Sequence, residues 1–272
     1  MLKTEKRNPN STHIDRMTFS EMMDLMAKEN LVAAEAVAKE KDTVAAVAEA
    51  VSLRMRRGGR LFYVGAGTSG RTGIADAAEC PPTYGISPDR VVGIMAGQKS
   101  GAVSRAKENV EDDGNAGRED LAAYVPTEAD SVIGISAAGG AAYVAEALAY
   151  ARSCGALTVA LTSNAGTKIT KIAEMSIVTD TGAEVITGST RMKAGTAQKL
   201  ALNMISTAVM VSLGYVYENM MINLKPSNEK LRLRVIGIFR EITGETEEKA
   251  VEALERADWN LRSAIEKYKA NS

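Results

Sequence analysis

Five short apolar runs, separated by segments with a helical pattern, constrain the fold of this chain more than any other feature. They cover residues 61–64, 90–95, 131–135, 157–161 and 175–178. Short strands that alternate with helices are typical of a parallel sheet covered on both faces. The sequence therefore predicts an α/β fold with a doubly wound, mostly parallel sheet.

Helical patterns occupy the two ends of the chain. Residues 18–57 are dense in Ala, Glu, Lys, Met and Val, with apolar positions three and four apart, which predicts two helices, the first capped at Thr18 or Ser20. Residues 193–213 predict one long apolar helix in the core or in a subunit contact. We expect an N-terminal helical segment at 1–58, a central domain at 59–225 and a C-terminal module at 226–272.

The C-terminal module is predicted to contain three short helices. Residues 229–272 are charged and helix-rich, with breaks at Thr243–Gly244 and near Asp258–Trp259. We expect these helices to pack around Trp259 and Leu261. A module of this size is marginally stable alone.

Composition excludes several classes of function. The 272 residues are 45% hydrophobic and 25% charged, as in globular proteins. A net charge of -1 and 4% aromatic residues argue against nucleic-acid binding. Because no apolar run approaches the roughly 20 residues of a membrane span and no signal peptide is evident, we expect a cytoplasmic protein without a membrane partner. One histidine, His13, and two distant cysteines, Cys80 and Cys154, predict no metal site.

A glycine-rich turn directly follows the first apolar run. Residues 65–71 read Gly-Ala-Gly-Thr-Ser-Gly-Arg, a strand-to-helix turn in which Gly67, Thr68 and Ser69 offer backbone and hydroxyl donors to an anion. A tight bend without a ligand is the alternative. The glycine spacing matches a dinucleotide fingerprint, but the next strand-like run lacks an acidic residue at its end. The turn therefore favours a sugar monophosphate.

Two further segments are predicted to complete this phosphate site. The first, residues 134–142, is a second glycine-rich turn that includes Ser136 and Gly139. The other, residues 188–199, places Ser189, Thr190 and Lys193 at the start of the long helix. Loops at the carboxyl ends of parallel strands and helix N-termini both bind anions.

Carboxylates are the candidates for acid-base chemistry. Glu79 is predicted to end the helix that begins at the first turn, with the diproline Pro81–Pro82 fixing the exit. A carboxylate at a helix C-terminus opposes the helix dipole, which invites a functional interpretation. Residues 108–113 form an acidic run that, taken alone, favours a solvated surface.

Segments 65–71, 79–85 and 189–199 together resemble the N-acetylmuramic acid 6-phosphate etherase family, which belongs to the sugar isomerase (SIS) domain superfamily. The resemblance runs from residues 4–11 to 228–231, and the tail is similar to the family's ubiquitin-associated (UBA)-like end. It implies a SIS fold, elimination of D-lactate from a sugar phosphate followed by addition of water in peptidoglycan recycling, and no metal or organic cofactor. It also implies a homodimer with sites at the subunit contact, to which Glu184 of a neighbour belongs.

The resemblance assigns roles to two glutamates. It implies that Glu79 protonates the departing lactate oxygen and that Glu111 removes the C2 proton, with Glu108 as the competing second carboxylate. This chain departs from the family at residues 137–142, where Ala-Ala-Gly-Gly-Ala-Ala replaces Ala-Ser-Gly-Arg-Thr-Pro. Only backbone N–H groups remain there to hold phosphate. A non-catalytic sugar-phosphate sensor and an aldose-ketose isomerase are the alternative functions.

Overall fold

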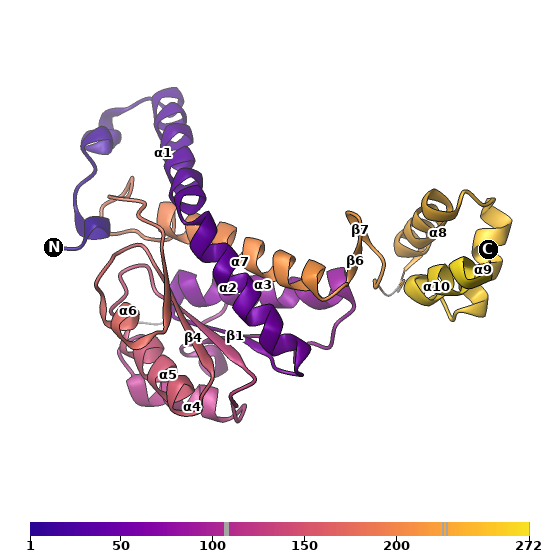
Figure 1. Cartoon of the computed structure of the whole chain (residues 1–272). Coiled ribbons are helices and arrows are strands. Elements are labelled where there is room, and N and C mark those ends of the chain that lie inside the picture. The colour runs from indigo at the N-terminus through magenta and orange to yellow at the C-terminus, as the bar shows by residue number, and fades with distance from the viewer. Residues whose placement is uncertain (106–108, 225, 227, 272) are drawn as a thin grey trace. The chain divides into compact units, whose positions relative to one another are not determined.

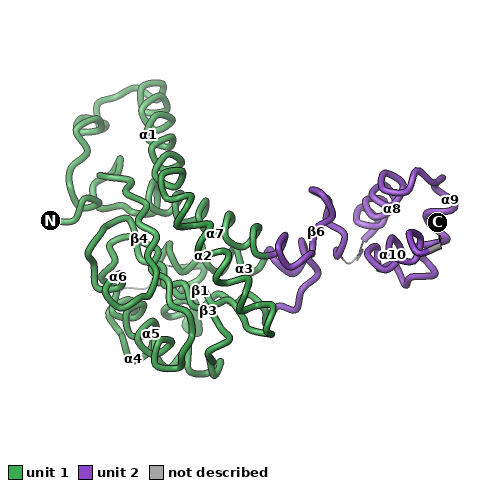
Figure 2. Tube along the Cα trace, viewed as in Figure 1, with its two compact units in different colours: residues 1–78, 89–209 green, residues 79–88, 210–272 purple. Residues whose placement is uncertain are grey.

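The computed structural model describes residues 1–105, 109–224, 226 and 228–271. The chain divides into two compact units (Figure 2): residues 1–78 with 89–209, and residues 79–88 with 210–272. Among the described residues, no helix has both the length and the apolar character required to cross a bilayer.

A parallel sheet forms the centre of the first unit (Figure 1). Among the described residues it has five strands in the order β2-β1-β3-β4-β5, and every neighbouring pair is parallel. The strands are β1 (Leu61–Gly65), β2 (Val91–Met95), β3 (Ser131–Ile135), β4 (Leu157–Thr162) and β5 (Met175–Val178). The predicted parallel sheet is thus confirmed, and the chain direction across the sheet reverses between β1 and β3.

Helices cover both faces of this sheet. Successive side chains of a strand point to opposite faces, and in β1 both sets are buried. Phe62 and Val64 belong to a core cluster with Leu148 of α5, whereas Gly73 of α3 lies against Tyr63. The described helices of this unit are α1 (Phe19–Lys39), α2 (Lys41–Arg56), α3 (Gly67–Tyr84), α4 (Gly114–Ala122), α5 (Ala142–Ser153), α6 (Lys168–Ile172) and α7 (Lys193–Ser212). The last residues of α3 and of α7 belong to the second unit.

The first helix begins where its cap was predicted. The Thr18 hydroxyl accepts a hydrogen bond from the Glu21 N–H, and the Glu21 carboxylate accepts one from the Thr18 N–H. This reciprocal capping box satisfies two backbone donors at the helix start. Short 3₁₀ turns, η1 (Lys3–Glu5), η2 (Pro9–Ser11) and η3 (Ile14–Arg16), precede it, and η4 (Gln98–Ser100) follows β2.

The helix α3 corrects one prediction. It does not end at Glu79 but continues through Pro81 and Pro82 to Tyr84. Proline removes a helical hydrogen bond but keeps a helical φ angle, so contacts elsewhere can hold the chain in the helix. Gly85, with a left-handed φ of 66°, ends α3, and its N–H donates to the Pro81 carbonyl at 2.8 Å.

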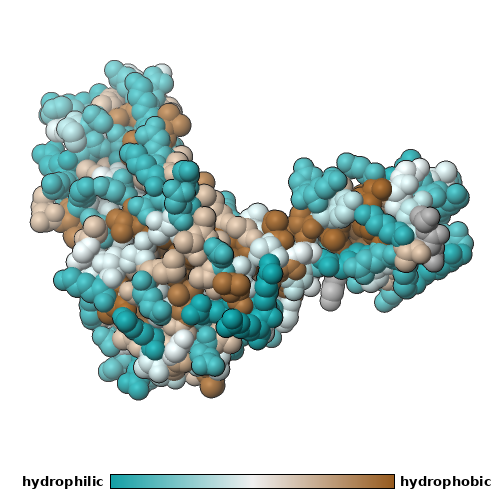
Figure 3. All heavy atoms as spheres, in the orientation of Figure 1, coloured by the Kyte–Doolittle hydropathy of each residue, from teal (hydrophilic) through white to brown (hydrophobic). Residues whose placement is uncertain are grey.

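The second unit contains the three predicted C-terminal helices. They are α8 (Glu229–Thr243), α9 (Glu247–Arg256) and α10 (Leu261–Asn271), and the short strands β6 (Val216–Tyr217) and β7 (Met220–Met221) precede them. Phe239, Leu254 and Leu261 are fully or almost fully buried, whereas Trp259 is only partly buried and lies beneath the Arg232 guanidinium. Of the two residues expected at the centre, Leu261 lies in this core, whereas Phe239 and Leu254 take the place expected for Trp259. Figure 3 shows hydrophilic residues over much of the visible surface of these helices.

Candidate functional site

The two glycine-rich loops lie side by side at the carboxyl edge of the sheet. Gly65 at the end of β1 pairs with Ile135 at the end of β3. The turn 66–69 and the loop 136–141 follow directly from these two strands. In open α/β sheets, ligands bind at the point where the order in which successive strands are added to the sheet reverses. Here that point lies between the parallel strands β1 and β3.

Close packing fixes the first turn. A Cβ on Gly65 would lie 2.6 Å from the Gly70 nitrogen, and a Cβ on Gly70 would lie 2.6 Å from the Met95 side chain, so neither position accommodates a larger residue. Gly67 begins α3 with a φ of 54°. Among the described residues, the N–H groups of Gly67, Thr68 and Ser69 have no hydrogen-bond partner. They are the free donors of a helix N-terminus.

The carbonyl side of the second loop is anchored to the end of β4. The Ala137 carbonyl accepts three hydrogen bonds, each of 3.0 Å, from the Thr162 hydroxyl, the Ser163 N–H and the Asn164 side-chain amide. All four residues are buried. Because these three hydrogen bonds hold the Ala137 carbonyl, the loop has a fixed conformation before any ligand binds.

Gly139 is the second fixed point of this loop. Its N–H donates to the Ser136 carbonyl and hydroxyl, both at 3.1 Å, and its carbonyl accepts from the Ile169 N–H at 3.2 Å. Its φ is 73°, and a Cβ there would lie 2.3 Å from the Thr167 hydroxyl oxygen, so only glycine fits. Ser136 therefore orders the loop through its oxygen, while its own hydroxyl proton remains available.

The opposite side of the loop presents backbone donors. In the part of the chain that the structure describes, four N–H groups close together in the sequence have no hydrogen-bond partner. They belong to Ala138, Gly140, Ala141 and Ala142. They lead into the N-terminus of the 12-residue helix α5, whose dipole favours negative charge. Such a row of backbone N–H groups is an anion site that needs no charged side chain.

Glu111 lies at the same helix end. Its carbonyl accepts a hydrogen bond of 3.0 Å from the N–H of Tyr143, the second residue of α5, and its side chain is exposed. The hydroxyl of Tyr143 donates to Asp120 at 2.8 Å. Burial, together with this bond to a carboxylate, raises the pKa of Tyr143 far above its ordinary value, so this phenol is not an acid at neutral pH. Glu108 lies outside the described residues.

The start of α7 packs against the first turn. A Cβ on Gly195 would lie 3.1 Å from the Thr68 methyl group, and the Gly195 N–H donates to the Thr190 carbonyl at 2.9 Å. Ser189 and Thr190 are partly exposed. The structure thus brings this predicted segment to the glycine-rich turn.

Lys193, predicted to bind phosphate, is hydrogen-bonded to carboxylates of its own chain. Its N–H and that of Ala194 donate to the two carboxylate oxygens of Glu184, each at 2.9 Å. Its ammonium forms a buried ion pair with Glu29, which also accepts a hydrogen bond from Asn8. The donors of Lys193 are thus committed to carboxylates of the protein itself. Glu184, expected to belong to a neighbour's site, is fully buried and caps α7 of its own chain.

Glu29 carries its charge despite burial. Burial raises the pKa of its carboxyl, but hydrogen bonds from Asn10, Lys193 and Asn8 and the charge of Lys193 together outweigh it, so the pKa lies below its ordinary value. No sequence pattern marks this pair, because 164 positions separate its members. The capping role of Glu184 was not predicted, because this residue lies nine positions before α7, outside the usual capping positions.

Glu79 lies on α3 and belongs to the second compact unit. Its side chain is exposed and forms no hydrogen bond or ion pair among the described residues. No cation among the described residues is therefore paired with this side chain.

Comparisons with known proteins agree with this architecture. Residues 43–152 match the N-terminal SIS domain of glucokinase regulatory protein, and residues 236–270 match a UBA-like domain. Phosphoheptose isomerase from Neisseria gonorrhoeae shares the fold, with a TM-score of 0.55, 18% identity and coverage of 71% of this chain and 98% of that chain. The Vibrio vulnificus NanR protein complexed with ManNAc-6P also shares it, with a TM-score of 0.52, 16% identity and coverage of 72% and 66%.

The sequence comparison is more specific. An N-acetylmuramic acid 6-phosphate etherase from Clostridium beijerinckii is 48% identical over 264 residues, which are 97% of this chain and 86% of that protein. One from Caldanaerobacter subterraneus is 49% identical over the same shares of both chains. This chain therefore belongs to the N-acetylmuramic acid 6-phosphate etherase family.

Proposed function

We propose that this protein is a carbon-oxygen lyase that cleaves the D-lactyl ether of N-acetylmuramic acid 6-phosphate. Elimination followed by hydration gives N-acetylglucosamine 6-phosphate and D-lactate, in the cytoplasmic recycling of peptidoglycan. The observation that carries this proposal is the near-half identity to etherases along 97% of the chain. The open row of N–H groups at α5 supports it, because it suits the phosphate of such a sugar.

The phosphate site is proposed to depend on backbone donors. The loop 137–142 has no hydroxyl or guanidinium side chain of its own. The N–H groups at the start of α5, the turn with Gly67, Thr68 and Ser69, and the hydroxyl of Ser136 would hold the phosphate, with Gly139 keeping the loop in shape. Ser189 and Thr190 extend this site from the segment before α7. Lys193 supports the site indirectly, by fixing the start of that helix.

Two carboxylates would perform the chemistry. Ring opening exposes the C1 aldehyde and makes the C2 proton acidic, so Glu111 can accept that proton. The electron pair then forms the C2–C3 double bond as the C3–O bond breaks, and Glu79 in its protonated form gives its proton to the departing lactate oxygen. Hydration then reverses the elimination with water in place of lactate, so that the water oxygen bonds to C3 and a proton returns to C2. The exposed position of Glu111 beside α5 suits a base that reaches a sugar held at that helix.

A homodimer is part of this proposal. Along α3, more than three helical turns lie between Gly67 and Glu79, about 18 Å of helix. We therefore assign the Glu79 of each site to a second copy of the chain. Exposed apolar side chains on α1 offer a contact surface, since Phe19, Met23 and Leu31 are 83%, 54% and 64% exposed and lie on one side of the helix.

The first test is D-lactate release from N-acetylmuramic acid 6-phosphate by the purified protein. Glu79→Gln should lower kcat by a factor of about 100 to 10,000, the contribution typical of a general acid, without changing the unfolding midpoint. Glu119→Gln, an exposed glutamate on α4, is the matched control and should keep full activity. Unchanged turnover in Glu79→Gln would contradict the assigned role.

The shared site has its own test. Mixing Glu79→Gln with Glu111→Gln subunits by refolding should restore activity, because about half of the dimers then contain one site with both native glutamates. Neither variant alone should show this activity. Mixed subunits that remain as inactive as the parents would refute assembly of the site from two chains.

A regulatory function is the second candidate, because residues 43–152 match a regulatory protein's domain and the loop 137–142 lacks polar side chains. The same assay separates the candidates. A regulator would bind the sugar phosphate, with a raised melting temperature, but release no lactate. An aldose-ketose isomerase would form a ketose phosphate and also release no lactate.

A further inference from the structure

The last turns of α3, which carry Glu79, are intrinsically weak. Pro81 and Pro82 have no N–H groups, so the carbonyls of Ala77 and Ala78, the two residues before Glu79, lose their helical partners. The Glu79 side chain makes no hydrogen bond or ion pair within the described residues that could fix it. The position of this carboxylate therefore depends on whatever holds the end of the helix.

The end of α3 rests on a neighbouring backbone segment. Gly85 adopts a left-handed φ of 66°, and a Cβ there would lie 2.0 Å from the Asn223 carbonyl oxygen. Only a glycine permits this approach. The backbone of Asn223 thus packs directly against the end of α3.

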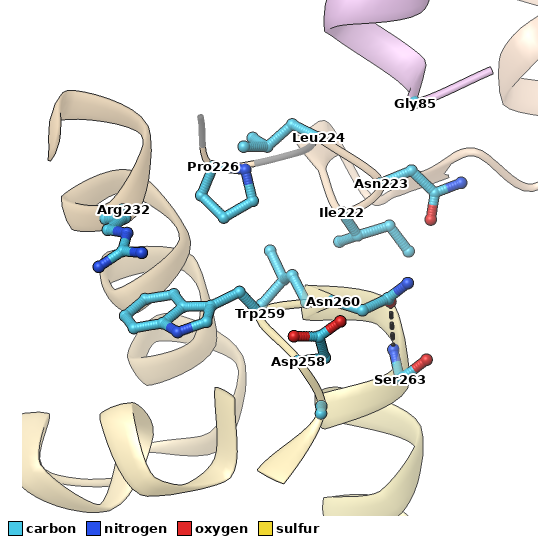
Figure 4. Close-up of a pocket in the computed structure, with 12 residues that line it drawn as sticks. Gly85, Ile222, Asn223, Leu224, Pro226, Arg232, Asp258, Trp259, Asn260 and Ser263 are labelled. Atoms are coloured by element: carbon cyan, nitrogen blue, oxygen red, sulfur yellow. Dashed lines mark hydrogen bonds between the residues drawn. The ribbon is translucent and has the colours of Figure 1, made fainter. Parts of the chain in front are cut away.

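The C-terminal helices hold Asn223 in place. Its side-chain oxygen accepts a hydrogen bond of 2.8 Å from the Arg262 guanidinium of α10. The residues on either side, Ile222 and Leu224, are 7% and 3% exposed and belong to the same hydrophobic cluster as Phe239. Figure 4 shows Ile222, Asn223 and Leu224 on one segment between Gly85 and the loop that carries Trp259 and Asn260.

A second contact ties the same helix to the strand before this segment. The Lys269 ammonium donates to the Tyr217 hydroxyl at 3.0 Å and lies 4.4 Å from the centre of the Tyr217 ring. The segment between β6 and α8 is therefore a structural part of the C-terminal module. Its contacts connect α10 through Asn223 to the end of α3.

We propose that the C-terminal helical module is a positioning element for catalysis, in which Arg262 acts through Asn223 and Gly85 to hold Glu79 in its working position. This inference rests on the role proposed for Glu79. Arg262 is a positioning residue, because its effect on the reaction passes through α3. The module thereby gains a role within the enzyme, separate from any contact with other proteins.

The test compares Arg262→Ala with Arg256→Ala in the full-length protein. Within the described part of the chain, Arg256, on α9, forms only an exposed ion pair with Glu252, which makes it a matched control. Losing one hydrogen bond of about 1 kcal/mol that holds the acid should lower kcat about three- to tenfold. KM should stay within about twofold, because phosphate binding uses other residues. Arg256→Ala should keep both constants.

Amide hydrogen exchange gives a readout that does not require activity. Arg262→Ala should speed exchange in residues 79–88, and Arg256→Ala should not. Arg262→Lys, which can still donate to Asn223, should recover part of both effects. If Arg262→Ala does not fold, Asn223→Ala removes the same hydrogen bond from the other side.

The outcomes separate this inference from the proposed function. An unchanged kcat in Arg262→Ala, or unchanged exchange in residues 79–88, would overturn the positioning role even if the native protein releases lactate. If the native protein releases no lactate, the proposed function fails, and the exchange measurement alone decides whether α10 holds the end of α3. Faster exchange together with a lower kcat and constant KM would support the inference.

Discussion

The helices α5 and α7 begin close to the same glycine-rich site, yet their N-termini have opposite roles. At α7, the N–H groups of Lys193 and Ala194 bind the Glu184 carboxylate. At α5, Ala141 occupies the N-cap position and its side chain caps nothing. Both helix ends match the sequence pattern of an anion site. The difference shows that such an end is available to a ligand only where the protein does not supply its own carboxylate.

This comparison separates stability from binding. The free donors at α5 are kept in place by a loop whose carbonyls are hydrogen-bonded elsewhere, so they need no ligand to be ordered. The donors at α7 are buried, and an unpaired buried N–H group costs about 1 to 3 kcal/mol. Changes at α7 should therefore lower the free energy of unfolding. Changes at α5 should alter affinity for sugar phosphate.

The largest effect is expected from Glu29→Gln, which removes the partner of the buried Lys193 ammonium. Breaking a buried ion pair on one side costs about 3 to 5 kcal/mol, since the other charge stays buried without compensation. Urea unfolding followed by circular dichroism measures this loss. Glu49→Gln, at an exposed position of α2, should change the free energy of unfolding by less than about 0.5 kcal/mol.

The same pair predicts a pH dependence. The pKa of Glu29 is lower in the folded protein than its ordinary value of 4.5. The stability that its charge contributes is therefore complete above about pH 4.5 and is lost as the pH falls through the folded pKa. Glu29→Gln should remove this part of the acid dependence. An identical pH profile of unfolding in both proteins would contradict the ion pair.

The second-largest loss of stability is expected from Glu184→Ala, which removes the carboxylate bound at the N-terminus of α7. Two buried N–H groups lose a charged acceptor, so we expect a loss of about 2 to 4 kcal/mol in the free energy of unfolding. Because the vacated end then resembles that of α5, inorganic phosphate should raise the melting temperature of this variant more than that of the native protein. An equal response to phosphate would mean that the two helix ends differ for another reason.

The sequence was sufficient for features encoded locally. The five strands, the Thr18 cap and the glycine turn depend on neighbouring residues, and all are present in the structure. It failed where a distant contact overrides a local preference. Pro81 and Pro82 are local breakers, yet α3 passes through them, and Lys193 has a phosphate-like context, yet Glu29 binds it. The roles of Glu79 and Glu111 stay predictions, because the shape of a single chain does not fix them.

A smaller effect on stability, with a clear effect on binding, is expected from Ala141→Asp. This change gives α5 the carboxylate that α7 already has. An N-cap aspartate should raise the free energy of unfolding by about 0.5 to 2 kcal/mol. It should also weaken sugar-phosphate binding at least tenfold, because the added negative charge at the N-terminus of α5 repels the phosphate. Calorimetry measures the affinity.

The neutral cap Ala141→Asn is the control for this change. It should give a similar gain in stability with a smaller loss of affinity, since it caps α5 without adding a negative charge. Equal affinities in Ala141→Asp and the native protein would mean that α5 is not where the phosphate binds, and the comparison between the two helix ends would lose its functional meaning.

The smallest effect is expected from Thr167→Val, beside the α5 loop. The Thr167 hydroxyl is buried next to Gly139 and has no hydrogen-bond partner among the described residues. Removing an unpaired buried hydroxyl loses no hydrogen bond and relieves its desolvation cost, so the free energy of unfolding should stay level or rise by up to about 1 kcal/mol. Thr162→Val is the matched change, because that hydroxyl donates to the Ala137 carbonyl, and it should cost about 1 kcal/mol. Equal losses in the two variants would show that Thr167 is bonded in the free protein, whereas a loss of sugar-phosphate affinity confined to Thr167→Val would add its hydroxyl to the donors that α5 keeps for its ligand.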